Sequence, residues 1–248
     1  HRDGDTFVLN GDYRYVVDGH TADLLIVAAR EEGSTGEQGV SLFLVPAESA
    51  GVNTQWLPTM DQGRKQAAIN LASVRVQSAS LMGECGQAWP SLSKILDLAA
   101  VALAAEQVGG CQQLLDMTVQ YTSERVQFNR PIASFQAVKH KAADMMLKTE
   151  VARSAVYYAA CVAEEALKGG DLAAELPEAA SVVKSYCSDA YFAVAGDSLQ
   201  LFGGVGFTWE YDVHLYFKRA KSSDHMLGDA CAHRERLAVA LLDQGRQS

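Results

Sequence analysis

The residues best suited to chemistry gather in one short stretch, Ser123 to Met145. It holds Arg125 and Arg130, with the aromatic Phe128 between them, and Gln136 follows shortly after. A guanidinium group is permanently charged and donates paired hydrogen bonds to phosphate oxygens. These side chains would suit a planar ligand that carries phosphate, although a solvated turn between two core helices explains the same pattern without any ligand.

A second stretch of this kind runs from Leu199 to Thr208 and contains Gly203, Gly204 and Gly206. Because glycine has no Cβ, its backbone takes positive φ values and lets N–H groups approach a pyrophosphate closely. The motif is weak by itself, since a helix end and a tight interhelical turn use the same glycines. Both interpretations stay open at this point.

The composition bounds the class of protein. Of 248 residues, 48% are hydrophobic and 21% charged, which is ordinary for a globular chain with a sizeable core. A net charge of -9 offers no basic surface, so nucleic acid is not expected as a partner. No apolar run is long and charge-free enough to span a bilayer. The first residues, His1 to Asp5, are polar and do not form a leader, so we expect a cytoplasmic location.

The cysteines and histidines show no pattern typical of a metal site. The five cysteines are odd in number, widely spaced and mostly set in apolar helical surroundings, which predicts reduced core residues. The histidines lack ligand-like pairing with acids and are interpreted as hydrogen-bonded polar residues. These are His140, His214, His225 and His233.

Residues 7 to about 80 have the β-branched content and the turn signals of strands. The predicted strands lie at 7–9, 13–17, 23–29, 40–46, 68–71 and 74–76. Asn10 and Gly11 predict a hairpin turn between the first two. We expect a small antiparallel sheet or part of a barrel. Because the strand pattern begins abruptly at residue 7, we also expect that an upstream portion is lacking.

From about residue 88 the apolar spacing becomes helical. Four long helices are predicted near 88–127, 131–168, 174–202 and 211–243. Short connections between helices of this length favour antiparallel packing in an up-down bundle. The sequence therefore predicts an α+β chain, with a partial antiparallel β domain at residues 1–83 and a four-helix bundle at 84–248.

Taken together, the motifs resemble those of the flavin-dependent acyl-CoA dehydrogenases. Arg-x-x-Phe-x-x-Pro-x-x-x-Phe-Gln begins at Arg125, and Gln-x-x-Gly-Gly-x-Gly-Phe begins at Gln200. Tyr211 opens a third motif that ends in Arg-Ala-Lys. The resemblance covers essentially the whole chain. It implies the C-terminal part of that family's middle β domain, followed by its C-terminal helical bundle, with the N-terminal helical domain absent.

The resemblance also implies FAD as cofactor and assigns roles to single residues. In the family, the hairpin residues matching Arg125 and Phe128 contact the pyrophosphate and adenine end of a FAD held mainly by a neighbouring subunit, and Gln136 would support the same region. The second motif would contact the same FAD through Gln200, Leu201, Gly203 and Gly204. Because these contacts act in trans, an oligomer is implied, with an electron-accepting flavoprotein as a further partner.

The chain departs from the family where the chemistry occurs. The family removes an α-proton from an acyl-CoA with a carboxylate base while a hydride passes to the flavin. The commonest position of that base matches Leu227, and the alternative position matches Ala99, so neither holds an acid. The motif that packs on the flavin ring falls on Tyr15 to Val17, and Val17 cannot donate a hydrogen bond.

The chain thus keeps the residues that contact FAD in the family but has no acid at the base positions. This pattern resembles the partner subunit of heterotetrameric acyl-CoA dehydrogenases of actinobacterial steroid side-chain degradation. The leading hypothesis is a subunit that completes the FAD site of a different, base-carrying chain. A self-sufficient homo-oligomer is the second hypothesis, with Asp229 as displaced base ahead of Asp97, Glu106 and Asp224. A non-catalytic helical scaffold without a cofactor is the third.

Overall fold

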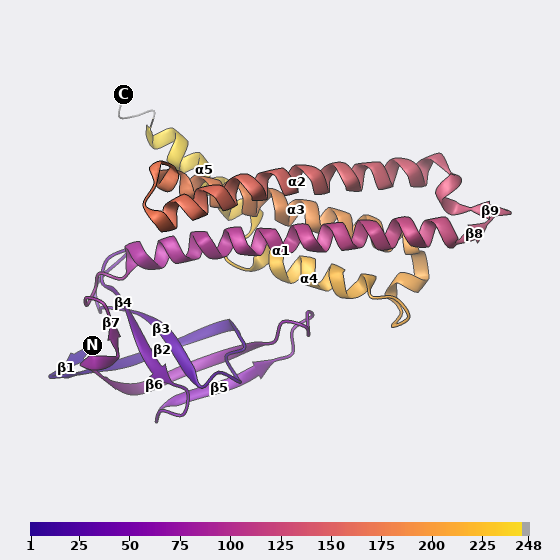
Figure 1. Cartoon of the computed structure of the whole chain (residues 1–248). Helices are drawn as coiled ribbons and strands as arrows, with labels where there is room; N and C mark the ends of the chain where they lie inside the picture. The colour runs from indigo at the N-terminus through magenta and orange to yellow at the C-terminus, as the bar shows by residue number, and fades with distance from the viewer. Residues whose placement is uncertain (245–248) are drawn as a thin grey trace. The chain divides into compact units, whose positions relative to one another are not determined.

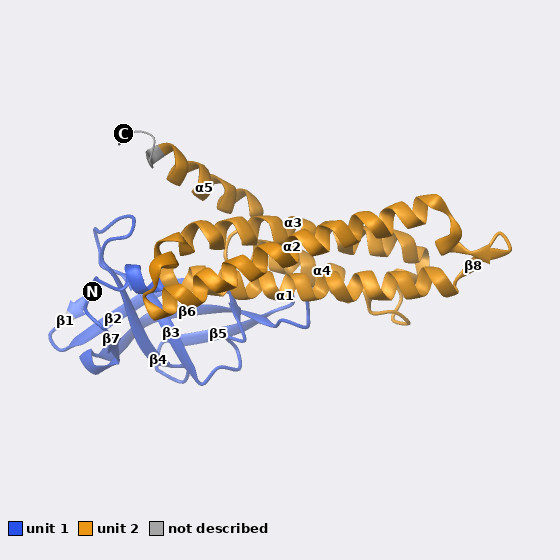
Figure 2. Cartoon of the chain, turned by 45° about the horizontal axis from the view of Figure 1, so that its top comes forward, with its two compact units in different colours: residues 1–93 blue, residues 94–248 orange. Residues whose placement is uncertain are grey.

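A computed structural model of the chain describes residues 1–244. It divides into two compact units, His1–Ser93 and Lys94–Ser248, coloured blue and orange in Figure 2. The first unit is built of β-strands and the second of α-helices (Figure 1). The predicted α+β architecture, with antiparallel strands followed by a helical bundle, is therefore confirmed.

The first unit contains two antiparallel sheets. One has the strand order β1-β2-β6-β5, made of Arg2–Asp3, Thr6–Val17, Gln66–Gln77 and Val52–Leu57. The other has the order β3-β4-β7, made of Leu24–Arg30, Val40–Pro46 and Leu81–Met82. Alternate residues of these strands form one apolar core, in which the rings of Phe7 and Phe43 lie 5.0 Å apart.

Three strand predictions need correction. Asn10 and Gly11 do not form a hairpin turn, because the runs on either side pair with the same strand, β6. Gly11 pairs with Leu71, and a register shift between Leu9 and Gly11 leaves only Asn10 of the two out of the ladder. The backbone N–H of Ser73 in β6 donates to the side chain of Asn10 at 2.8 Å. The runs predicted at 68–71 and 74–76 are accordingly one strand. The sequence missed β5, whose largely exposed residues give little apolar signal.

The second unit is a bundle of long antiparallel helices (Figure 1). The helices are α1 (Trp89–Glu124), α2 (Gln136–Lys168), α3 (Leu176–Phe202), α4 (Val213–His225) and α5 (Ala230–Gln244). Small residues let them pack closely. A Cβ added at Gly110 of α1 would lie 2.4 Å from the ring of Tyr191 on α3, so glycine is needed there to admit the aromatic side chain. None of the described helices is long and apolar enough to cross a membrane.

Two helix boundaries differ from the prediction. The first connection is longer than a turn: α1 ends at Glu124, and a small hairpin, β8 (Val126–Gln127) and β9 (Arg130–Pro131), precedes α2. The helix predicted at 211–243 is divided into α4 and α5, because Leu227 and Gly228 take positive φ values of 60° and 94°. A left-handed pair of residues cannot continue a right-handed helix.

The cysteines and histidines are only partly as predicted. All five cysteines are free, but Cys85, Cys161 and Cys231 are exposed, so only Cys111 and Cys187 are core residues. The buried ring nitrogens His214 Nε2 and His233 Nδ1 have no hydrogen-bond partner, contrary to the expectation that each histidine is fully hydrogen-bonded. Among the described residues, no group of His, Cys, Asp and Glu side chains could hold a metal ion.

Candidate functional site

The hairpin between α1 and α2 presents the first group of predicted contact residues. Phe128 and Asn129 form its tip with φ values of 52° and 62°, the left-handed combination that two-residue hairpin turns favour. At its base, the N–H of Ile132 donates to the carbonyl of Arg125 at 2.9 Å. The hairpin extends beyond the ends of the helices (Figure 1), and the Phe128 side chain is 85% exposed.

The two arginines of this hairpin have different surroundings. The guanidinium of Arg130 lies 4.0 Å from the ring centroid of Phe135, within cation–π distance. Arg125 is exposed, and its side chain makes no hydrogen bond or ion pair within residues 1–244. Neither guanidinium donates a hydrogen bond within the described residues, but Arg130 is held against the Phe135 ring whereas Arg125 has no such contact.

Gln136 is exposed and is the first residue of α2. The helix is preceded by Phe135, which offers no capping side chain, and its first turn contains no acid. The N–H groups of Gln136 and Ala137 have no partner within the described residues, whereas that of Val138 donates to the carbonyl of Phe135. Unpaired N–H groups at a helix start carry partial positive charge. Together with Arg125, this helix start makes the hairpin region electrostatically suited to a phosphate group.

The second group of predicted residues lies where α3 ends. Gly203 has φ 66° and ψ -146°, a conformation reserved for glycine. A Cβ at Gly204 would meet nothing within 4 Å, whereas one at Gly206 would lie 2.9 Å from the Cβ of Phe202. Gly206 is thus required by packing inside the chain, but Gly204 is not. Gln200 is exposed, and Leu201 is half-buried against an apolar cluster of the bundle.

Aromatic packing brings the two groups to the same end of the bundle. The ring of Tyr121 on α1 stacks on that of Phe202 on α3, with centroids 4.2 Å apart and planes 12° from parallel. Tyr121 lies one turn before Arg125, and Phe202 directly precedes Gly203. A cation, an exposed ring and open glycine backbone are a set of groups that fits the pyrophosphate and adenine of FAD.

The two expected base positions have apolar surroundings. Leu227 is half-buried and packs against a cluster that includes Ala100 of α1 and Val183 of α3. Ala99, directly before Ala100, is half-buried as well. Leu227 takes a left-handed conformation that costs a non-glycine residue about 1–2 kcal/mol, so the turn around it must be held by other contacts.

Those contacts come from Lys184 and His233. Lys184 on α3 is fully buried, and its ammonium donates to Ser188 Oγ at 2.9 Å, to the carbonyl of Asp224 at 3.0 Å and to that of Gly228 at 2.9 Å. Burial lowers the pKa of Lys184 to about 8. A ring nitrogen of His233 lies 2.9 Å from the carbonyl oxygen of Leu227. Sequence reasoning missed Lys184, although a lysine inside an apolar helical run was a usable signal.

The acids weighed as displaced bases all have structural partners. The guanidinium of Arg236 binds both carboxylate oxygens of Asp97. Glu106 and Asp224 pair with arginine and lysine side chains at 3.2 Å and 3.1 Å. Asp229 caps α5 by accepting the N–H of Ala232 at 2.8 Å, and this bond lowers the pKa of its carboxyl.

The residues expected against the flavin ring lie in β2. Tyr15 sits at a register shift between Tyr13 and Val16, with φ 61° and a side chain that is 63% exposed. Val17 is also partly exposed and carries only apolar side-chain atoms. Strained residues of this kind concentrate at functional sites. The bulge turns an aromatic ring outward without adding a hydrogen-bond donor at position 17.

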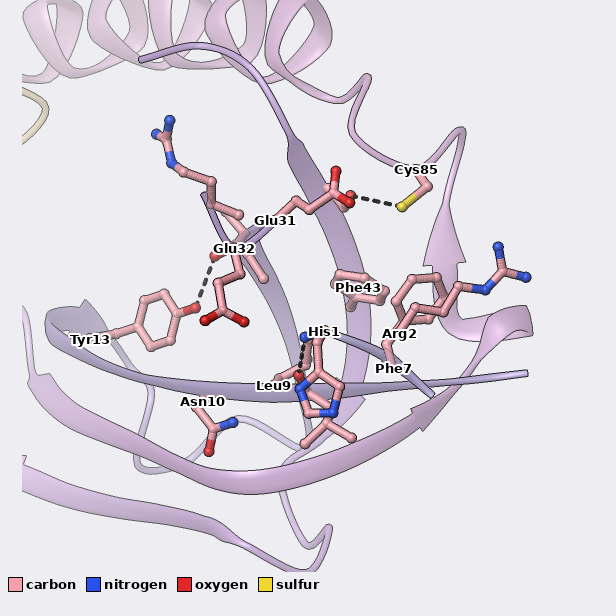
Figure 3. Close-up of a pocket in the computed structure, with 15 residues that line it drawn as sticks. His1, Arg2, Phe7, Leu9, Asn10, Tyr13, Glu31, Glu32, Phe43 and Cys85 are labelled. Carbon is pink, nitrogen blue, oxygen red and sulfur yellow. Dashed lines mark hydrogen bonds between the residues drawn. The ribbon is translucent and has the colours of Figure 1, made fainter. Parts of the chain in front are cut away.

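A cavity of about 530 Å³ opens in the first unit (Figure 3). Phe7, Leu9 and Phe43 give it apolar walls, and the hydroxyl of Tyr13 donates to the carbonyl of Ala28 at 2.9 Å along one side. No residue predicted to contact FAD or to act as base lines this cavity. It is therefore separate from the candidate site.

Comparison with known proteins gives consistent matches. A family model described as the C-terminal domain of acyl-CoA dehydrogenases matches residues 86–242. Acyl-CoA dehydrogenase IpdE2 of Mycolicibacterium smegmatis is 34% identical over 223 residues, which cover 90% of this chain and 59% of that protein. An acyl-CoA dehydrogenase of Bacillus subtilis is 30% identical over 225 residues, covering 87% of this chain and 55% of that protein.

The solved structures agree with these matches. Butyryl-CoA dehydrogenase from Megasphaera elsdenii superposes with a TM-score of 0.88 at 28% identity, covering 97% of this chain and 62% of that one. The chain thus spans less than two thirds of the length of each of these proteins.

Proposed function

The chain belongs to the acyl-CoA dehydrogenase family, whose members use FAD, and on this premise we propose that it is the FAD-completing subunit of a hetero-oligomeric acyl-CoA dehydrogenase. Bound FAD supplies the hydride acceptor for α,β-dehydrogenation of an acyl-CoA thioester. This chain would bind the pyrophosphate and adenine end of a FAD whose ring lies in the partner. The base would come from the partner as well.

The observation that carries this proposal is a set of binding groups that the chain itself leaves uncovered. Arg125 has no partner among residues 1–244, Phe128 is 85% exposed, and Gly204 has open space where a side chain would be. Exposed aromatic and arginine side chains are typical of binding surfaces. The set is therefore arranged to meet a ligand that another chain holds.

The surroundings of the base positions support a role without proton abstraction. Leu227 and Ala99 have no titratable atom. A general base works best when its pKa lies near the working pH, whereas the pKa of Asp229 is lowered by its helix cap. The self-sufficient enzyme with Asp229 as displaced base is accordingly the weaker alternative. The scaffold hypothesis does not explain why Arg125 has no side-chain partner within the described residues or why the space beside Gly204 is open.

The proposal extends to substrate and partners by family likeness. The substrate class is an acyl-CoA thioester bound by the complex. Steroid side-chain thioesters are the class to test first, because the absence of an acid at Leu227 and Ala99 resembles the partner subunits of the dehydrogenases that act on them. The partner is a homologous acyl-CoA dehydrogenase subunit that retains the base. Electrons would leave the flavin to an electron-accepting flavoprotein.

The deciding experiment measures flavin absorbance and assembly mass. The chain is purified alone and again after co-expression with the product of a neighbouring acyl-CoA dehydrogenase gene. We expect flavin only in the mixed assembly, with both chains present in its mass. Stoichiometric FAD in the isolated chain, together with turnover of an acyl-CoA, would reject the proposal and favour the self-sufficient enzyme.

A further inference from the structure

The tip of the α1–α2 hairpin is held in a conformation that its sequence does not favour. Phe128 has φ 52°, and a bulky non-glycine residue in the left-handed region is strained by about 1–2 kcal/mol. The hairpin ladder has two residue pairs, Val126 with Pro131 and Gln127 with Arg130. So short a hairpin is marginal in water without further packing. Other contacts must therefore keep its exposed tip in place.

Phe135 supplies a fixed point for those contacts. Its N–H donates to the carbonyl of Ile132 at 3.1 Å, and its own carbonyl accepts the N–H groups of Val138 and Lys139, each at 3.1 Å. These bonds fix Phe135 at the start of α2, directly before Gln136. Its half-buried ring contacts side chains of the hairpin.

The side chains of Arg130 and Phe128 both contact the Phe135 ring. The guanidinium of Arg130 lies 4.0 Å from its centroid, a close cation–π contact. The ring of Phe128 approaches it edge-on, with centroids 6.0 Å apart and planes at 85°. Arg130 and Phe128, on either side of Asn129, thus tie the tip of the hairpin to the start of α2.

We propose that Arg130 is a positioning residue, whose stacking on Phe135 holds Phe128 at a fixed place relative to Gln136. Arg125 keeps the phosphate-binding role, so the two arginines divide charge recognition from geometry. This inference rests on the proposed function, because it names what orders the surface that meets FAD. A hairpin ordered in advance loses less conformational entropy on binding.

The test uses Arg130→Gln, with Arg130→Lys as conservative variant and Arg125→Gln as matched control that removes the same charge from the same hairpin. In the chain alone, amide hydrogen exchange is followed at Ile132 and Phe135. In the co-expressed assembly, FAD retention is measured over a series of salt concentrations. Loss of an exposed cation–π contact should speed exchange about two- to fivefold in Arg130→Gln.

The expected pattern separates the two arginines. Arg130→Gln speeds exchange and lowers FAD retention with an unchanged salt dependence, and Arg130→Lys restores most of both. Arg125→Gln leaves exchange unchanged and weakens the salt dependence, because it removes a phosphate contact. Unchanged exchange in Arg130→Gln overturns the inference whatever the flavin does.

Two other outcomes have separate meanings. Faster exchange with full FAD retention in Arg130→Gln, while Arg125→Gln loses FAD, overturns the positioning role and leaves the proposed function standing. Full FAD retention in both variants overturns the proposed function and, with it, the role of Arg130 toward the flavin.

Discussion

Arg125 and Arg130 carry the same charge on one hairpin, yet their contacts differ. The Arg130 guanidinium lies against Phe135, and Arg125 has no side-chain partner within the described residues. The same distinction applies to glycines, since Gly206 is enclosed by Phe202 and Gly204 faces open space. At the scale of single residues, a suitable residue without a contact inside the chain is the better candidate for binding a ligand.

Arg125→Ala should lower FAD retention by the mixed assembly about 10- to 100-fold. The reason is the loss of a charge-assisted hydrogen bond to phosphate, worth roughly 1.5–3 kcal/mol. Flavin absorbance after dialysis measures the effect. Lys168→Ala removes a cation at the far end of α2 and serves as control, with no expected change. Equal losses in both variants would point to net charge instead of a local contact.

Gly204→Ala should lower FAD retention with little effect on stability, whereas Gly206→Ala should lower stability. A Cβ at Gly204 meets nothing within 4 Å, so the free energy of unfolding should change by less than about 0.5 kcal/mol while FAD retention falls. At Gly206 the Cβ would lie 2.9 Å from that of Phe202, and overpacking should cost roughly 1–3 kcal/mol. Urea unfolding and flavin absorbance check both variants. Unaltered FAD retention in Gly204→Ala would remove this glycine from the site.

At the scale of elements, polar contacts determine how the α4–α5 turn is built. The Lys184 ammonium binds carbonyls at the end of α4 and in the turn, where the helix dipole favours a positive charge. His233 and the capping Asp229 hold the other side. The left-handed Leu227 is therefore maintained by hydrogen bonds, most of them partly buried.

Lys184 should make stability rise with pH between about 8 and 10.5. Burial lowers its pKa from 10.5 to about 8, so within this window the unfolded chain binds a proton that the folded chain lacks. Unfolding then becomes less favourable as pH increases, by roughly 3 kcal/mol across the window. Urea unfolding of the wild type and of Lys184→Met measures the difference. If Lys184→Met proves unstable, Ser188→Ala can be used, because it removes one acceptor of the ammonium, lowers the pKa of Lys184 further and extends the lower edge of the window downward.

Two arginines of α5 should differ in their effect on its docking. Arg236 binds Asp97, whose side chain is 4% exposed, whereas Arg234 and its partner Asp189 are more than half exposed. Arg236→Ala leaves a buried carboxylate unpaired and should cost roughly 3 kcal/mol, against less than about 1 kcal/mol for Arg234→Ala. Amide exchange of α5 compares them. Equal protection in the two variants would contradict the assigned burial of Asp97.

At the scale of the whole molecule, the chain combines a family fold with base positions that hold no acid. Leu227 and Ala99 stand where a carboxylate is expected, while the groups suited to FAD remain exposed at one end of the bundle. The division of labour that we propose lies between subunits, so its tests belong to the assembly.

Asp229→Asn should leave the acyl-CoA dehydrogenase activity of the mixed assembly unchanged. Asparagine caps a helix about as well as aspartate, so the fold is also preserved. The measurement is acyl-CoA-dependent reduction of the flavin. Its loss, with FAD still bound and α5 intact, would identify Asp229 as the base and restore the self-sufficient enzyme as the better hypothesis.

The class of fold and the candidate contact residues can be predicted from the order of residues alone. Helical periodicity after residue 88 and the motifs at Arg125 and Gln200 act locally, through spacing and residue type, so they can be read from the chain. The same local signals overextended the helices at Arg125 and misread Asn10 and Gly11 as a hairpin turn, because strand pairing is set by partners far along the chain.

Which of two residues of the same type already has a contact inside the chain follows only from the folded structure. Arg130 stacks on Phe135, Gly206 packs on Phe202, and Lys184 binds carbonyls 40 and 44 residues away. The last predicted helix is also divided at Leu227, where a partly buried hydrogen bond to His233 helps to offset a strained backbone. Such contacts depend on the path of the backbone through the hairpin and turns and on packing between distant segments, and residue type and spacing alone do not encode them.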